Sequence, residues 1–138
     1  MGGLINSPGE NWTMGPIAKV SQKIKEVTQA GDIVLSWWPG DVFLSGRNNF
    51  PGMENEFGYF FISDKIPREL AKQYHIATDS DLIDAIKNNI PKAVVLNYAY
   101  PFEERRRCLE EHLKDNYLPL ERIGHTVIYV SKKKRMQN

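Results

Sequence analysis

The sequence DIVLSWWPGDVFLSGR, residues 32–47, decides the expected fold of this chain. Residues 33–38 form a continuous apolar run, rich in β-branched and aromatic side chains, which predicts a strand covered on both faces. Pro39, Gly40 and several polar residues follow at once, so this strand delivers a polar loop. Loops at the carboxyl ends of strands are the usual ligand sites of open α/β sheets, and this loop is therefore the first candidate site.

Helical and strand-like patterns flank the central strand on both sides. Before it, apolar residues spaced three and four apart predict an amphipathic helix from Ile17 that ends at Ala30-Gly31. After it, residues 46–66 show no sustained period and are expected to form a long loop. Residues 67–74 are predicted to form a short helix, residues 78–90 a capped helix and residues 93–96 a buried strand. The segment with Leu109, Leu113 and Tyr117 is predicted to form an amphipathic helix, and residues 120–123 and 126–130 two strands at hairpin spacing.

Strands that alternate with helices and then close in a hairpin predict an α/β fold. We expect a three-layer sandwich with a mostly parallel, Rossmann-like sheet and an antiparallel C-terminal hairpin. We also expect an irregular lead-in or linker over residues 1–16, a single α/β domain over 17–131 and a basic tail over 132–138. A length of 138 residues with 41% hydrophobic residues suits one packed core.

Composition and motifs argue against several classes of function. The 18 Lys and Arg residues nearly balance the 17 Asp and Glu residues, so no overall field selects nucleic acid as a partner. Neither GxGxxG nor GxxxxGK[ST] occurs, and no cofactor is expected. The three histidines are far apart and Cys108 is the only cysteine, so no metal site is expected. No GxSxG elbow occurs and Glu54 and Glu56 are typical of a solvated loop, so no catalytic residue is assigned.

The loop after the first strand carries the candidate ligand residues. Its tryptophans offer stacking faces for a sugar ring, and its arginine and amides offer hydrogen bonds to hydroxyls, phosphate or carboxylate. The alternative is structural, because tryptophans that end a buried strand are often core or lid residues and an arginine often pins a loop. The residues in question are Trp37, Trp38, Asp41, Arg47 and Asn48, with Asn49 beside them.

Three segments together resemble a known family. They are residues 31–35 (GDIVL), 41–49 (DVFLSGRNN) and 90–96 (IPKAVVL), followed by a last helix that closes at Tyr117. Over most of residues 17–130 the chain resembles the soluble C-terminal domain of membrane glycosyltransferases that use polyprenyl-phosphate sugars, the group related to dolichyl-phosphate-mannose protein mannosyltransferases. The residues that match typical positions of this family, none with a known catalytic role, are Asp32, Ser45, Gly46, Arg47 and Pro91.

The resemblance implies an accessory role. In the family, the membrane-spanning part holds the catalytic acidic residues and the lipid-linked donor, while this domain lies on the extracytoplasmic side. The implied partners are the membrane-embedded part of the same polypeptide and an acceptor glycan or protein. Since no segment reaches the roughly 18–20 apolar residues that cross a bilayer, the isolated fragment is expected to be soluble. The alternative is a freestanding α/β ligand-binding protein or small enzyme with an anion or sugar site at the same loop.

Overall fold

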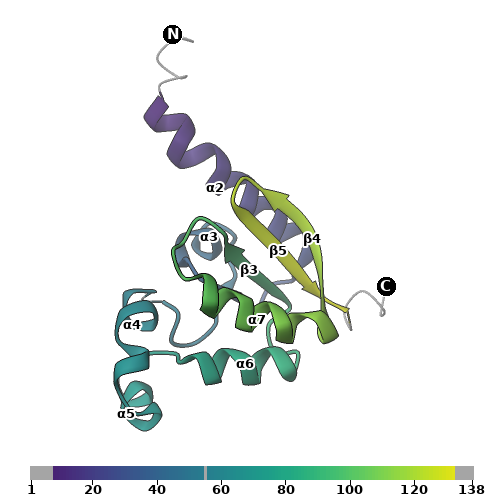
Figure 1. Ribbon diagram of the computed structural model, residues 1–138. Helices are drawn as coiled ribbons and strands as arrows, with labels where there is room; N and C mark the ends of the chain where they lie inside the picture. Colours follow the sequence, from purple (N-terminus) through teal and green to yellow (C-terminus); the bar gives the residue numbers. More distant parts are fainter. Residues whose placement is uncertain (1–7, 55, 133–138) are drawn as a thin grey trace.

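A computed structural model describes residues 8–54 and 56–132, with side chains from residue 15 onward. Five strands and seven helical segments follow one another along this part of the chain (Figure 1). In chain order they are α2 (Pro8–Val27), β1 (Ile33–Ser36), α3 (Pro39–Phe43), β2 (Asn48–Asn49), α4 (Glu56–Phe61), η1 (Ser63–Lys65), α5 (Arg68–Gln73), α6 (Asp79–Lys87), β3 (Ala93–Asn97), α7 (Glu103–Asn116), β4 (Tyr117–Ile123) and β5 (Thr126–Ser131).

The strands form one open, mixed sheet in the order β2-β1-β3-β5-β4, which confirms the α/β class. β1 runs parallel to both β2 and β3, whereas β5 pairs antiparallel with β3 and β4. The sheet is therefore mixed, with as many antiparallel as parallel pairings, and not mostly parallel as the sequence predicts. The expected C-terminal hairpin is confirmed: β4 and β5 are joined at Gly124, whose φ of 60° suits a residue without a Cβ.

Alternate residues of β3 face two separate hydrophobic cores. Val94 and Leu96 belong to the core that β1 and β3 share with α4, α6 and α7. Ala93 and Val95 belong to the second core, which contains residues of α2 and α3. Successive residues of a strand point to opposite faces of the sheet, so a strand that is covered on both faces needs apolar residues at every position. This explains why the β3 sequence is a continuous apolar run.

Helix α2 corrects the expected lead-in. It begins at Pro8, so residues 8–16, predicted to be irregular, are helical. Pro8 occupies the first turn, where its missing N–H would be unbonded in any helix. Pro16 costs one hydrogen bond inside the helix, but Val20 and Ile24 dock the following turns on the sheet and are fully buried. Figure 1 shows the N-terminal half of α2 projecting beyond the sheet. The predicted basic tail lies outside the described residues apart from Lys132.

Residues 46–66, predicted as a loop, contain three short elements: β2, α4 and η1. None has the length that a sustained hydrophobic period requires, so pattern reasoning misses them. Helix α4 forms where the aromatic side chains of Tyr59 and Phe60 enter the core. The predicted helix over 78–90 is confirmed as α6, with Thr78 and Asp81 forming a reciprocal capping box at its start.

Candidate functional site

The polar loop after β1 folds at once into the short helix α3. Trp38 precedes the helix in an extended conformation, and Pro39 occupies its first turn, where proline is favoured. The indole of Trp38 lies against Gly40 so closely that a Cβ at residue 40 would come within 2.5 Å of the ring. Trp38 is half-buried in this position, and its indole ring leaves no room for a side chain at residue 40.

Trp37 belongs to the core and not to a ligand site. It is 0% exposed, stacks on Tyr100 with ring centroids 6.1 Å apart and meets Phe60 edge-on at 5.0 Å. A ligand has no access to a ring in this position, which corrects the expectation that Trp37 stacks on a sugar. Its indole N–H makes no hydrogen bond within the described residues.

Arg47 holds the end of helix α2. Its Nε donates to the Thr28 hydroxyl over 2.9 Å, and its Nη2 donates to the carbonyl oxygens of Thr28 and Lys25 at 3.0 and 3.3 Å. The Lys25 carbonyl belongs to the last turn of α2 and the Thr28 carbonyl follows the helix directly, where backbone carbonyls lack intrahelical donors. The guanidinium is thus engaged with a helix terminus, and a grip of Arg47 on phosphate or carboxylate stays a prediction.

Asn48 lines a pocket of about 540 Å³ beside α3. The side chain of Asn48 is exposed, whereas Asn49 is engaged with the backbone of Ser36, Phe50 and Met53. Sequence reasoning did not assign Phe43, which is 81% exposed at this pocket, or the exposed Glu54. The full lining comprises Pro39, Val42, Phe43, Arg47, Asn48, Asn49 and Glu54. One aromatic face with an amide and a carboxylate suits a small hydroxylated ligand.

Asp41 does not line this pocket and is only 4% exposed. Its backbone carbonyl accepts a hydrogen bond from Ser21 of α2 over 2.7 Å, but its carboxylate makes no hydrogen bond to a described residue. Burial, and secondarily the negative charge of Glu56, raises the pKa of Asp41 to about 7. The carboxyl of Asp41 therefore exchanges a proton near neutral pH.

Asp41, Glu56 and Tyr100 together form a group of titratable residues that we call the edge cluster. The Tyr100 hydroxyl donates to Glu56 Oε2 over 2.9 Å, and burial and this carboxylate raise the pKa of Tyr100. The three residues come from α3, from α4 and from the loop after β3. Since β1 and β3 are parallel, the segments that follow them leave the sheet at the same edge. The edge cluster can accept hydrogen bonds and hold a proton, but it repels anions.

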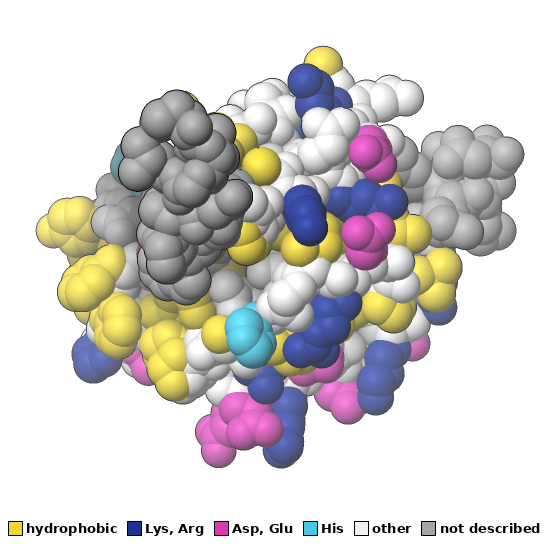
Figure 2. Space-filling model, turned by 90° about the horizontal axis from the view of Figure 1, so that it is seen from above, with side chains coloured by type: hydrophobic (Ala, Val, Ile, Leu, Met, Phe, Trp, Pro, Cys, Tyr) yellow, Lys and Arg dark blue, Asp and Glu magenta, His cyan; other side chains and the backbone are white. Residues whose placement is uncertain are grey.

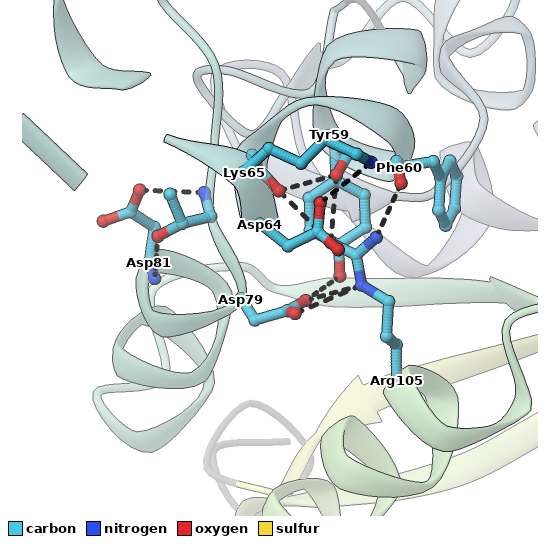
Figure 3. A network of polar contacts seen from close by, with 9 residues as sticks. Tyr59, Phe60, Asp64, Lys65, Asp79, Asp81 and Arg105 are labelled. Carbon is cyan, nitrogen blue, oxygen red and sulfur yellow. Dashed lines mark hydrogen bonds and ion pairs between the residues drawn. The ribbon is translucent and has the colours of Figure 1, made fainter. Parts of the chain in front are cut away.

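A larger polar network around Arg105 is structural (Figure 3). Arg105 extends from α7, pairs with Asp79 at 3.1 Å and donates to the backbone oxygens of Tyr59 and Phe60 at 2.9 and 3.1 Å. The Tyr59 hydroxyl donates to the same Asp79 over 2.5 Å, and the guanidinium lies 4.2 Å from the Tyr59 ring centroid. These contacts join α4 and the start of α6 to α7, and they leave the guanidinium fully engaged.

The largest pocket described, about 630 Å³, lies between residues 50–52 and helices α5 and α6. Apolar residues form much of its lining, and Arg68 at its rim pairs with Asp81 at 2.6 Å and with Asp84 at 3.1 Å. None of the ligand-binding residues that the sequence predicts lines this pocket. Figure 2 shows another face of the molecule, on which basic and acidic side chains are interspersed, so no basic patch for nucleic acid gathers on it.

In the comparison with known proteins, no protein-family model, curated protein or solved structure matches the chain. Among residues 8–54 and 56–132, no helix is both long and apolar enough to cross a membrane. The same residues contain no group of three or more His, Cys, Asp or Glu side chains that could hold a metal ion.

Proposed function

We propose that this chain is the extracytoplasmic accessory domain of a membrane glycosyltransferase of the mannosyltransferase type, which uses a lipid-linked sugar. In this proposal the domain binds a sugar unit of the acceptor and leaves transfer to the membrane-embedded part of the same polypeptide. The resemblance of residues 17–130 to such domains motivates the proposal, and the pocket beside α3 supports it.

The pocket is the observation that carries the binding role. The exposed ring of Phe43 offers an apolar face to the carbon side of a pyranose. The amide of Asn48 donates and accepts hydrogen bonds, and the carboxylate of Glu54 accepts them from ring hydroxyls. All three side chains line the same hollow of about 540 Å³, large enough for one sugar ring.

Four of the five residues that carry the family resemblance support an accessory role, because each of these four has a structural partner. Arg47 bonds the end of α2, and Ser45 accepts the Arg47 backbone N–H at 3.2 Å. Asp32 accepts the backbone N–H of Gln29 at 2.8 Å, and the Pro91 carbonyl accepts the Tyr117 hydroxyl at 2.6 Å. Residues occupied in this way maintain a framework, which supports an accessory role for the domain.

The proposal extends to the finer description of the fold. The two cores on opposite sides of β3 support a three-layer arrangement, with α2 and α3 as one outer layer and α4, α6 and α7 as the other. The parallel trio of β2, β1 and β3 supports a Rossmann-like half to which the antiparallel hairpin is added.

Sugar titration of the isolated chain tests the binding role. We expect weak, saturable binding of methyl α-mannoside by calorimetry or NMR shift mapping, lost in the Phe43→Ala variant and weakened in Asn48→Ala and Glu54→Gln. The matched control is Phe57→Ala, because Phe57 is 58% exposed on α4 but does not line the pocket. The sugar site is disproved if no sugar binds, or if Phe43→Ala and Phe57→Ala behave alike.

A transfer assay tests the accessory role. Incubated with a polyprenyl-phosphate mannose and an acceptor peptide, the chain is expected to transfer no sugar, and sustained turnover would refute the proposal. The gene offers a second test, because a reading frame that continues upstream into repeated hydrophobic spans supports the membrane assignment. An in-frame stop directly before Met1 contradicts it.

The second candidate function is a freestanding binding protein or small enzyme. One observation favours it: an Asp41 pKa of about 7 is the value that a general acid or base needs at neutral pH. The anion site in this alternative loses its main residue, because Arg47 is bonded to α2. A reaction carried by the isolated chain and abolished by Asp41→Asn would decide for this candidate.

A further inference from the structure

The largest described pocket shares no lining residue with the proposed sugar site. It has a volume of about 630 Å³, within the range of small-molecule sites, and lies between residues 50–52 and helices α5 and α6. Apolar side chains line much of it: those of Phe50, Pro51, Ile76, Ala77, Ala85 and Ile90. An apolar wall stabilises an apolar group that leaves water, so the ligand of this pocket should carry one.

His75 lines this pocket from an unusual backbone position. Its φ of 57° lies in the left-handed region, directly after helix α5 and its cap. The backbone N–H of His75 donates to the Lys72 carbonyl over 3.1 Å, and that of Ile76 donates to the Ala71 carbonyl over 2.9 Å, which is the Schellman arrangement of a helix end. Glycine is the usual residue there, because a Cβ is unfavourable at this φ. Backbone strain of this kind is concentrated at functional sites, and here it holds an imidazole at the rim of the pocket.

The charged residues that line the pocket fall into two groups. Arg68 is paired with Asp81 at 2.6 Å and with Asp84 at 3.1 Å, so these three charges are engaged. Glu69 and Lys72 lie three residues apart on α5, a spacing that places them on the same side of a helix. Both are exposed, yet neither side chain forms a hydrogen bond or an ion pair within the described part of the chain. The pocket therefore presents one carboxylate and one ammonium group, close together, that are available to a ligand.

We propose that this pocket binds a free α-amino acid with an apolar side chain. The carboxylate of Glu69 accepts N–H hydrogens from the ammonium group of the ligand, while Lys72 and the imidazole of His75 donate to its carboxylate. The side chain of the ligand lies on the apolar wall. A ligand with a single charge fits less well, because an anion meets Glu69 and a cation meets Lys72. Since the two pockets share no lining residue, the proposal goes beyond the sugar-binding role and does not depend on it.

Three ligands that share a phenyl group test this proposal on the full chain. L-phenylalanine carries both charged groups, 3-phenylpropionate lacks the ammonium group and 2-phenylethylamine lacks the carboxylate. At neutral pH, phenylalanine is expected to shift the backbone NMR signals of residues 50–52 and 68–77 in a saturable way. Its dissociation constant should be about fivefold lower than that of either analogue, since each analogue lacks one exposed charge contact. The proposal is overturned if phenylalanine does not bind, or if either analogue binds as tightly.

Charge variants show which residue holds which group of the ligand. Lys72→Gln should weaken phenylalanine binding about fivefold but not that of 2-phenylethylamine, and Glu69→Gln should weaken phenylalanine binding but not that of 3-phenylpropionate. His75→Gly, which suits the left-handed backbone, should also weaken phenylalanine binding. Lys87→Gln is the matched control, because Lys87 is exposed on α6 but does not line the pocket. Equal affinities for phenylalanine in Lys72→Gln and Lys87→Gln overturn the proposal. Methyl α-mannoside should not displace phenylalanine, so failure of one site is recognised independently of the other.

Discussion

The Nε of Arg47 donates a hydrogen bond to the hydroxyl of Thr28 at the end of α2, over a distance of 2.9 Å. The same guanidinium also bonds the Thr28 backbone carbonyl at 3.0 Å. Two segments 19 residues apart are thereby joined, and the loop after β1 is anchored to the helix that precedes it. Gly46, with a φ of 75°, provides the turn that directs residue 47 back toward α2.

Replacing Arg47 should therefore affect stability more than binding. Arg47→Ala leaves the last carbonyls of α2 without this donor, and we expect the free energy of unfolding to fall by about 1–3 kcal/mol. Urea unfolding measures the change. Arg68→Ala is the comparison, because Arg68 forms exposed ion pairs and its loss should have little effect. Unchanged stability together with lost sugar binding would instead assign Arg47 to the ligand site.

The Asp41 carboxyl should make stability depend on pH. Its pKa is about 7 in the folded chain against 3.8 for the ordinary value, so between these pH values the folded state binds a proton that the unfolded state has lost. Stability should fall as the pH rises through this interval, by about 4 kcal/mol at most, and stay level above it. Asp41→Asn should remove this component from urea-unfolding curves taken at pH 4 to 8. A component of equal size in the variant would contradict the assignment.

Arg105 should be the most sensitive arginine of the run 105–107. Its side chain is 16% exposed, and Arg105→Ala removes the ion pair with Asp79 and the bonds to two backbone carbonyls of α4. We expect a loss of about 3–5 kcal/mol, because Asp79 and those carbonyls lose their main donor. Thermal and urea unfolding test this. Arg107→Ala, which removes only an exposed pair with Glu103, should change little, and equal losses in the two variants would refute the network.

Gly40 should not tolerate alanine. A Cβ at residue 40 meets the Trp38 ring at 2.5 Å, so Gly40→Ala must displace the indole, change tryptophan fluorescence and cost about 1–2 kcal/mol. An unchanged emission spectrum in Gly40→Ala would show that Trp38 does not rest on residue 40.

Much of the fold follows from local patterns in the sequence. The apolar runs of β1 and β3, the hairpin at Gly124 and the cap at Thr78 are predicted because each depends on residues that are close together in the chain. Helices α3 and α4 are missed because they are too short to show a period. The proportion of parallel pairing is also missed, since β5 inserts between β3 and β4 and no local pattern encodes that position.

The candidate site divides in the same way. The sequence by itself determined that the loop after β1 brings polar and aromatic residues to the carboxyl end of a buried strand. Only the tertiary structure decided what each residue does there: Trp37 is enclosed by Phe60 and Tyr100, and Arg47 is taken up by the end of α2. The pKa of Asp41 likewise depends on burial and on Glu56, a residue of another helix. Secondary structure depends on neighbours along the chain, whereas accessibility, charge state and free hydrogen-bonding capacity depend on neighbours in space.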